Sequence, residues 1–125
     1  MRQAPIHLDT SFLIRALRPG TAEDSELRGF LAAGRGLATS SIAWAEFLCG
    51  PLDDQQIRAA TRLTSERVPF TEKDAALAAE LFNDSGRRRN SLTDCMIAAI
   101  ALRCNAQLAT SNQTDFERLG VSLIG

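Results

Sequence analysis

The sequence is poor in cysteine and histidine and has no long hydrophobic segment. Its three cysteines, Cys49, Cys95 and Cys104, are an odd number without CxxC spacing, and His7 is the only histidine. Disulfides and a zinc site are therefore not expected, and each cysteine is interpreted as a small core residue. No apolar run approaches the roughly 20 residues that span a bilayer, and residues 1–9 lack the apolar core of a signal peptide. We therefore expect a cytoplasmic protein that does not associate with membranes.

An excess of either charge is also absent. Fourteen basic and fifteen acidic residues give a formal net charge of -1, so the overall charge gives no argument for a nucleic-acid partner. The 125 residues are 45% hydrophobic and 23% charged, which is typical of one globular domain. A chain of this size buries about two thirds of its unfolded surface without help from a disulfide or a structural metal. We expect a single domain over residues 1–125.

Short β-type runs alternate with longer helical ones, which is typical of a parallel sheet covered by helices. Strands are predicted over residues 5–9, 36–40, 67–70, 107–110 and 121–124. Helices are predicted over residues 10–17, 22–33, 41–48, 53–63, 71–84, 91–104 and 112–119. The helix over residues 91–104 is apolar nearly all round and should be deeply buried. The predicted fold class is therefore α/β.

Four carboxylates are predicted near the edge where open α/β sheets bind ligands, beyond the carboxyl ends of the strands. They are Asp9 after the first strand, Glu46 in the helix after the second, Asp94 at the start of the buried helix, and Asp115 after the fourth strand. Each also has a purely structural interpretation. Asp9 would cap a helix, Asp94 would form a capping box with Ser91, and Asp115 would oppose a helix dipole. Glu46, expected to be partly buried, would form a salt bridge with an arginine.

Four carboxylates in one cleft would repel one another and raise one another's pKa values unless a cation lay among them. Oxygen ligands without cysteine or histidine favour Mg²⁺ or Mn²⁺. Such an ion polarises phosphorus and lowers the pKa of a bound water, so phosphodiester hydrolysis is the chemistry that these residues favour, with one metal ion or two. The hydroxyls of four residues at the strand ends would bind water or orient carboxylates, namely Thr10, Ser11, Ser40 and Thr110.

Three consecutive arginines, Arg87, Arg88 and Arg89, precede the helix that carries Asp94. Their charges are predicted to rim the same cleft and to hold a nucleic-acid backbone near the metal. A solvated loop is the alternative interpretation of this run.

Four segments at characteristic spacings carry a family resemblance. They are IHLDTSFLI at residues 6–14, ATSSIAWAEF at 38–47, LTDCMIAA at 92–99 and LATSNQTDF at 108–116. Together they cover the chain nearly from end to end, and in this order they resemble the PIN-domain family, specifically the VapC-type ribonuclease toxins of toxin–antitoxin pairs.

The resemblance implies a metal-dependent endoribonuclease with a three-layer α/β/α sandwich and a short, mostly parallel central sheet. It implies that Asp9, Glu46 and Asp94 surround Mg²⁺ or Mn²⁺, and that the protein binds RNA as substrate, a cognate antitoxin protein, and usually a second copy of itself. Many relatives carry an acid at the position of Asn112, so Asp115 is taken here as the fourth carboxylate, and the choice between the two stays open. In this hypothesis Asp9 and Asp94 hold the metal, Glu46 completes its shell or orients the attacking water, and Asp115 supports a water or a second ion.

Two other functions fit parts of the sequence. A phosphatase or phosphoacceptor domain also uses an aspartate after its first strand, but a dehalogenase-type nucleophile needs a second Asp two positions away, where this chain has His7 and Ser11. A catalytically silent module of the same fold would bind RNA or a protein partner. The presence of all three core acids disfavours that second alternative.

Overall fold

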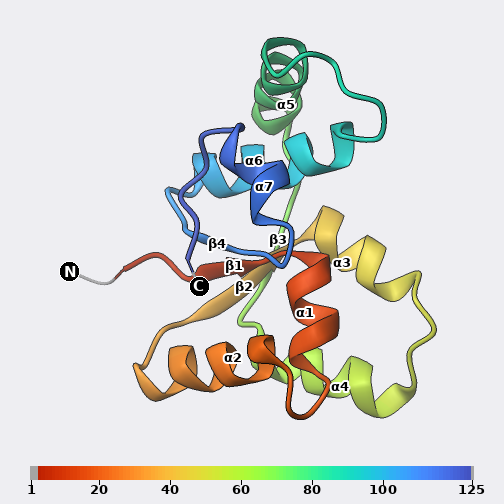
Figure 1. The fold of residues 1–125 in the computed structure, drawn as a ribbon, viewed down its shortest axis with the longest axis vertical. Helices are drawn as coiled ribbons and strands as arrows, with labels where there is room; N and C mark the ends of the chain where they lie inside the picture. Colours follow the sequence, from red (N-terminus) through yellow and green to blue (C-terminus); the bar gives the residue numbers. More distant parts are fainter. Residues whose placement is uncertain (1–2, 125) are drawn as a thin grey trace.

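The centre of the molecule is one parallel sheet with the strand order β3-β2-β1-β4 (Figure 1). The computed structural model describes residues 3–124. The strands are short: β1 (Ile6–Leu8), β2 (Leu37–Ser40), β3 (Arg67–Val68) and β4 (Leu108–Ala109). Strand β1 lies between β2 and β4, with His7 opposite Ala38 on one side and Leu108 on the other. Because the pairings are parallel, the carboxyl ends of these strands share one edge of the sheet.

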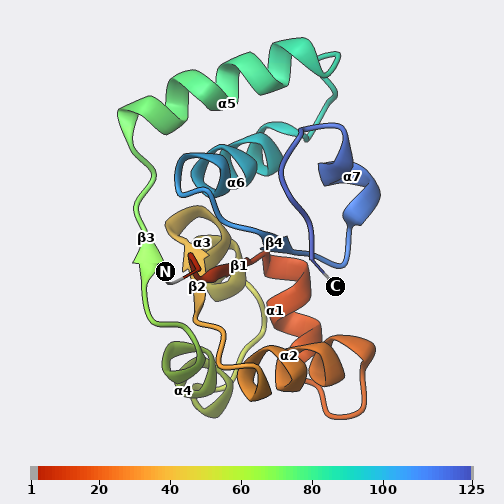
Figure 2. The same ribbon diagram turned by 90° about the vertical axis from the view of Figure 1, so that its left-hand side faces the viewer.

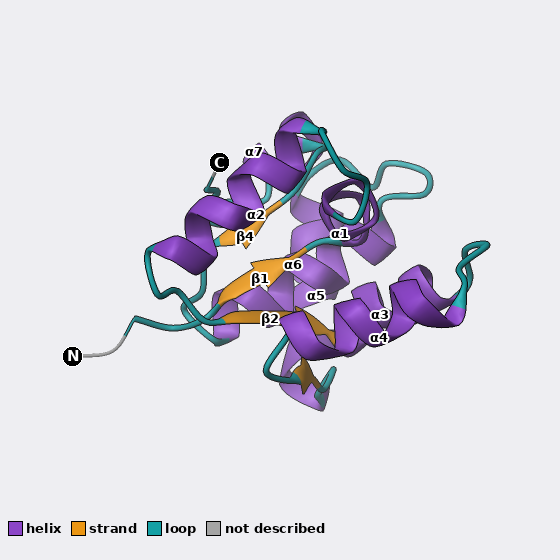
Figure 3. Ribbon diagram, turned by 90° about the horizontal axis from the view of Figure 1, so that it is seen from below, coloured by secondary structure: helices purple, strands orange, loops and turns teal. Residues whose placement is uncertain are grey.

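Helices cover both faces of the sheet and produce the three-layer arrangement that the family resemblance implies. The helices are α1 (Thr10–Ala16), α2 (Ala22–Ala32), α3 (Ser41–Leu48), α4 (Asp54–Leu63), α5 (Glu72–Asp84), α6 (Leu92–Arg103) and α7 (Gln113–Glu117). Helices α1, α2 and α4 lie on one side, whereas α6 and α7 lie on the other, with α5 stacked outside α6 (Figures 1 and 2). Helix α3 lies at the level of the sheet, between the two helical layers (Figures 1 and 2), and the view from below shows β4, β1 and β2 side by side (Figure 3).

Side-chain caps begin two of the predicted helices, α3 and α5. The Ser40 hydroxyl accepts a hydrogen bond from the Ala43 amide and caps α3, and Thr71 forms a capping box with Asp74 at the start of α5. Ser91 behaves differently. Its hydroxyl donates a hydrogen bond of 2.7 Å to the carbonyl oxygen of Arg88 and makes no capping hydrogen bond to α6. The predicted capping box with Asp94 is therefore wrong.

The hydrophobic core lies mainly in two layers, one on each face of the sheet. Side chains of β1 and α1, among them Ile6, Leu8 and Phe12, pack in the first layer. Helix α6 supplies much of the second layer, and six of its residues are buried. The prediction that α6 is deeply buried is confirmed, although Leu92 at its start is 48% exposed.

Two expectations about the fold are corrected. Residues 121–124 were predicted as a strand but form no regular one. They make a single parallel bridge, between Leu123 and Leu108 of β4. Cys95 is buried as predicted, but Cys49 is exposed at the end of α3 and is no core residue. Within the described residues, none of the helices has the length and apolar character needed to cross a membrane.

Candidate functional site

The four predicted carboxylates come from four different elements at the carboxyl edge of the sheet. Asp9 directly follows β1, Glu46 lies in α3, Asp94 is in the first turn of α6, and Asp115 is in the first turn of α7. Burial raises the pKa of Asp94 to about 6, and the negative charges of Asp9, Asp115 and Glu46 add to this shift. The structure therefore brings all four close enough for their charges to interact.

Asp9 is the most buried of the four, with 4% of its surface exposed. Its Oδ2 atom accepts two hydrogen bonds, one of 2.9 Å from the Ser11 hydroxyl and one of 2.8 Å from the Thr110 hydroxyl. Burial raises the pKa of Asp9 even though both hydroxyls stabilise its charged form. Asp9 occupies the N-cap position of α1 but its side chain makes no capping hydrogen bond, so capping does not account for it.

Backbone amides bind the two hydroxyls that donate to Asp9. The Ser111 amide donates a hydrogen bond of 3.2 Å to Ser11 Oγ, and the Asn112 amide donates one of 3.0 Å to Thr110 Oγ1. Each hydroxyl oxygen thus accepts a hydrogen bond from an amide and donates its own proton to the Asp9 carboxylate. The sequence interpretation of Ser11 and Thr110 as residues that orient a carboxylate matches this arrangement.

Glu46 is exposed, which corrects the expectation that it is partly buried. The faces of α3 that enter the core carry Ala43 and Phe47, whereas Glu46 projects from another face of the helix. It forms no ion pair with an arginine among residues 3–124, so the salt-bridge interpretation is wrong for the described part of the chain. Its Oε1 atom lies 2.9 Å from Thr10 Oγ1, a hydroxyl that also lies 3.0 Å from the carbonyl oxygen of Ala43.

Asp115 and Asn112 occupy different places on α7. Asn112 is the N-cap residue, and its backbone amide is bound to Thr110 while its side chain caps nothing. Asp115 is exposed, and its charge raises the pKa of Asp94. Of these two residues, only Asp115 carries a charge that acts on Asp94.

The donor chemistry of the cluster fits a hard divalent cation. Its atoms are carboxylate and hydroxyl oxygens, and no histidine or cysteine is among them. The raised pKa values of Asp9 and Asp94 are those of crowded and desolvated carboxylates whose charges a cation would stabilise. Within the described residues, however, no three acidic, histidine or cysteine side chains already converge as a ready-made metal shell.

Arg118 is a residue near the cluster that the sequence interpretation missed. It ends α7, and its positive charge lowers the pKa of Asp94 against the effect of the neighbouring acids. Its Nε donates a long hydrogen bond of 3.4 Å to the carbonyl oxygen of Asp115, and its Nη1 is buried without a hydrogen-bond partner among the described residues. The spacing of three positions from Asp115 on one short helix is the signal that would have found it.

The arginine run splits into two parts. The Arg87 guanidinium lies 5.4 Å from the ring centre of Phe82 and donates a hydrogen bond to Asn83, so it is held against the end of α5. Arg88 and Arg89 are exposed in the loop that leads into α6.

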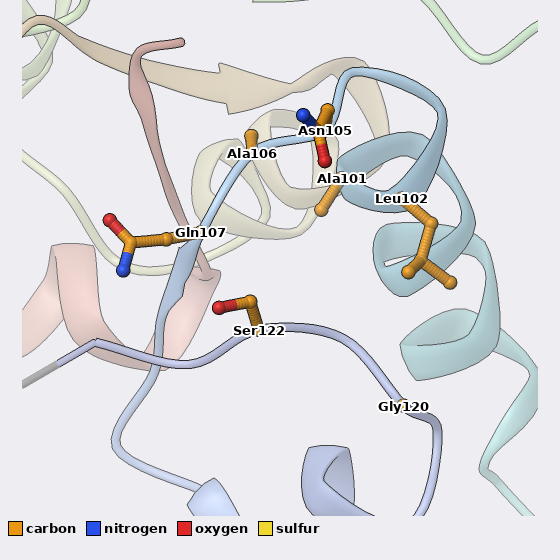
Figure 4. Close-up of a pocket in the computed structure, with 7 residues that line it drawn as sticks. All are labelled: Ala101, Leu102, Asn105, Ala106, Gln107, Gly120 and Ser122. Atoms are coloured by element: carbon orange, nitrogen blue, oxygen red, sulfur yellow. The ribbon is translucent and has the colours of Figure 1, made fainter. Parts of the chain in front are cut away.

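A surface pocket lies away from the acidic cluster, toward the amino end of β4 (Figure 4). Its lining contains no acidic, basic, histidine or cysteine side chain and consists of Ala101, Leu102, Asn105, Ala106, Gln107, Gly120 and Ser122. This pocket offers no ionisable side chain for acid–base chemistry, so the acidic cluster is the better candidate for a catalytic site.

Comparison with known proteins agrees with this fold. The family model described as PIN domain matches residues 6–121, so the chain belongs to the PIN domain family. No curated protein sequence is similar enough to this chain to count as a match.

Several solved structures share the fold at low sequence identity. VapBC2 from Rickettsia felis, bound to a DNA fragment from its promoter, is 21% identical with a TM-score of 0.75, and the match covers 96% of each chain. VapBC-1 from nontypeable Haemophilus influenzae is 23% identical with a TM-score of 0.72, covering 95% of this chain and 96% of the other. VapBC-5 from Mycobacterium tuberculosis, a member of the VapBC family of toxin–antitoxin systems, is 26% identical with a TM-score of 0.59, covering 94% of this chain and 91% of the other.

Proposed function

We propose that this chain is a metal-dependent endoribonuclease and the toxin of a type II toxin–antitoxin pair. The observation that carries the proposal is the position of four acids from four elements, Asp9, Glu46, Asp94 and Asp115, near the carboxyl edge of the sheet. The charges of the other three acids add to the effect of burial on the pKa of Asp94. Membership of the PIN domain family supports a nuclease. A divalent cation bound among these acids would polarise the phosphodiester and lower the pKa of a water molecule.

The residues of the chain then have distinct tasks. Asp9 and Asp94 hold Mg²⁺ or Mn²⁺, and the Ser11 and Thr110 hydroxyls keep the Asp9 carboxylate in one orientation. Asp94 has to lose its proton to act as a ligand, so protons compete with the metal and metal binding weakens as the pH falls. Glu46 is exposed to solvent and orients the attacking water or completes the metal shell. Asp115 supports a water or a second ion.

The substrate is RNA, and its backbone needs positive charge near the metal. Arg88 and Arg89 are exposed in the loop before α6 and serve as phosphate contacts. Arg87 is the weaker contact because its guanidinium is already engaged by Phe82 and Asn83.

The partners of the protein are a cognate antitoxin and a second copy of the chain. Structures with the same fold include a toxin–antitoxin complex from Klebsiella pneumoniae and the VapBC-5 system of Mycobacterium tuberculosis. The acidic cluster is a suitable target for an antitoxin arginine, because charge-assisted hydrogen bonds would relieve the repulsion that the other acids exert on Asp94. We further propose that the chain is one domain and acts in the cytoplasm.

Cleavage of RNA by purified, antitoxin-free protein tests the proposal. The reaction is run with Mg²⁺, with Mn²⁺ and with EDTA, beside an Asp94→Asn variant and an Asp84→Asn control at the exposed end of α5. We expect cleavage that requires metal, is lost in Asp94→Asn and is unchanged in Asp84→Asn. Cleavage that persists in EDTA, or an unaltered rate in Asp94→Asn, contradicts the assignment. A well-folded protein that binds RNA and Mn²⁺ but cleaves nothing is instead a silent binding module.

A further inference from the structure

Glu23 lies outside the predicted acidic cluster but is connected to it. The residue is in the first turn of α2, and its side chain is only 13% exposed. Its Oε2 atom accepts a hydrogen bond of 2.6 Å from the Ser111 hydroxyl and one of 2.9 Å from Arg15 Nε. One carboxylate oxygen therefore ties together α1, α2 and the segment that follows β4.

Ser111 continues this connection toward the site. Its hydroxyl donates a hydrogen bond to Glu23, and its backbone amide donates one of 3.2 Å to Ser11 Oγ. The Ser11 hydroxyl in turn donates 2.9 Å to Oδ2 of Asp9. Three hydrogen bonds thus lead from a carboxylate on α2 to the most buried carboxylate of the site.

Stability alone does not account for this use of Glu23. Its ion-pair partner Arg15 is 52% exposed, and ion pairs with such solvent access contribute little to the free energy of folding. Its Oε1 atom is buried without a hydrogen-bond partner among the described residues, an arrangement that opposes folding. The Ser111 hydrogen bond lowers the pKa of Glu23, so the carboxylate is ionised at neutral pH and accepts strongly from that hydroxyl.

The neighbouring acid on the same helix has no such connection. Asp24 also lies in the first turn of α2 and also forms an ion pair with an arginine. Its Oδ1 atom accepts a hydrogen bond of 3.1 Å from Arg28 Nε. Its other oxygen accepts a hydrogen bond from the Gly20 amide. Asp24 shares with Glu23 the favourable interaction with the helix dipole and a surface ion pair, so it is a matched control for both.

We propose that Glu23 is a positioning residue of the nuclease site, which holds Ser111 so that the Ser111 amide fixes Ser11 and the Ser11 hydroxyl fixes Asp9. The catalytic consequence rests on the proposed function, whereas the hydrogen-bonded connection does not. Glu23 touches neither RNA nor metal in this role. Its effect is to keep the Asp9 carboxylate in one orientation when the substrate arrives.

Four variants test the connection: Glu23→Ala, Glu23→Gln, Ser111→Ala and the double variant of Glu23→Ala with Ser111→Ala. Asp24→Ala is the control. The first readout is hydrogen exchange of the Ser111 amide in metal-free protein, which needs no catalytic activity. We expect exchange about tenfold faster in Glu23→Ala and unchanged in Asp24→Ala, because only Glu23 holds Ser111 in place. Thermal unfolding of each variant separates this local effect from a general loss of folding.

The second readout is steady-state cleavage. We expect Glu23→Ala to lower kcat about tenfold with KM within a factor of two, because the metal site loses orientation while the RNA surface is intact. Glu23→Gln keeps an amide oxygen that accepts from Ser111 and should restore most of the activity. The double variant should be no slower than Ser111→Ala, since both changes break the same connection.

The outcomes distinguish the two proposals. If Ser111 exchanges at the wild-type rate in Glu23→Ala, or if Asp24→Ala lowers kcat equally, the positioning role is overturned. If Glu23→Gln is as slow as Glu23→Ala, the role is also overturned, and Glu23 acts through its charge instead. A wild-type protein that cleaves no RNA contradicts the proposed function and with it the catalytic role, whereas faster exchange at Ser111 would still establish the connection to Asp9.

Discussion

Thr110 Oγ1 donates a hydrogen bond of 2.8 Å to Oδ2 of Asp9, although the two residues are 101 positions apart in the chain. The register of the sheet brings them together. Leu8 is opposite Ala109 in the parallel pairing of β1 with β4, so the next residue of each strand emerges at the same edge. The local chemistry of the site therefore depends on the pairing of two very short strands.

Removal of the Thr110 hydroxyl should destabilise the protein. Thr110→Val leaves the buried Asp9 carboxylate with one hydroxyl donor instead of two, which should cost about 1–3 kcal/mol in the free energy of unfolding at pH 7. Thr110→Ser keeps the hydroxyl and should lose clearly less. Chemical denaturation of the metal-free proteins measures both, and equal stability of Thr110→Val and the wild type would exclude an energetic role for this hydrogen bond.

Asp94 should make the metal-free fold less stable as the pH rises. Its pKa is raised from an ordinary 3.8 to about 6, so the folded protein binds this proton more tightly than the unfolded chain does. The contribution of Asp94 to stability is therefore present below about pH 4, falls as the pH rises through about 6, and is constant above.

Asp94→Asn should remove that pH dependence. We expect it to be more stable than the wild type at pH 7 by about 1–2 kcal/mol, a value reduced from the full shift because Asp94 is partly exposed to solvent. Denaturation at pH 4, 5, 6 and 7 without metal compares the two proteins. A variant less stable than the wild type at pH 7 would contradict the raised pKa of Asp94.

Arg118 should keep the pKa of Asp94 from rising further. Its positive charge favours the ionised form of that carboxyl, so Arg118→Ala should move the Asp94 titration to a pH above that of the wild type. Arg118→Lys preserves the charge and should titrate close to the wild type. Carbon-13 NMR of the Asp94 carboxyl group follows the titration directly, and identical curves for all three proteins would place Arg118 outside the range of this electrostatic effect.

The ion pair between Asp74 and Arg103 should stabilise the contact between α5 and α6. Asp74 has no exposed side-chain surface, and its Oδ1 atom accepts a hydrogen bond of 2.7 Å from Arg103 Nε. Asp74→Ala removes this pair and the capping box with Thr71, so we expect a loss of about 2–4 kcal/mol. Arg28→Ala breaks an exposed ion pair and is the control, with an expected loss below about 1 kcal/mol. A loss that small for Asp74→Ala would contradict the assigned role of the buried pair.

The same ion pair should fail in acid. Burial pushes the pKa of Asp74 upward, but hydrogen bonds from Arg103 and Thr71 more than offset this, and the pKa lies below its usual value. A carboxyl with a lowered pKa contributes stability above its unfolded pKa and loses it as the pH falls through the folded one. Part of the acid unfolding below about pH 4 should therefore be absent in Asp74→Ala.

Arg88 and Arg89 should contribute to RNA affinity through phosphate contacts. Replacing both arginines with alanine should weaken RNA binding. It should also reduce the slope of log Kd against log salt concentration by about 0.7 for each lost contact to single-stranded RNA. The matched control replaces Arg58 and Arg62, two exposed arginines on α4. Binding is measured by fluorescence anisotropy in EDTA, and an equal change of slope in the control pair would remove the special role of the loop before α6.

The sequence predicted the elements well because their signals are local. Apolar periodicity and capping residues act over a few positions, so α4 and α5 begin within one residue of their predicted starts at residues 53 and 71. Exposure was harder to predict. The apolar neighbours of Glu46 in the sequence suggested burial, but neighbours along a helix point in different directions, and the carboxylate is exposed.

The amino-acid sequence by itself determined the α/β class, the order of the elements and the chain segments that carry Asp9, Glu46, Asp94 and Asp115. Only the tertiary structure decided which hydroxyls bind Asp9 and that the charge of Arg118 acts on the pKa of Asp94. It also decided that Glu23 accepts a hydrogen bond from Ser111, 88 positions away in the chain. The physical reason is the difference in range: helix caps and periodicity need residues a few positions apart, whereas these contacts require the strand register and the helix packing to be in place first.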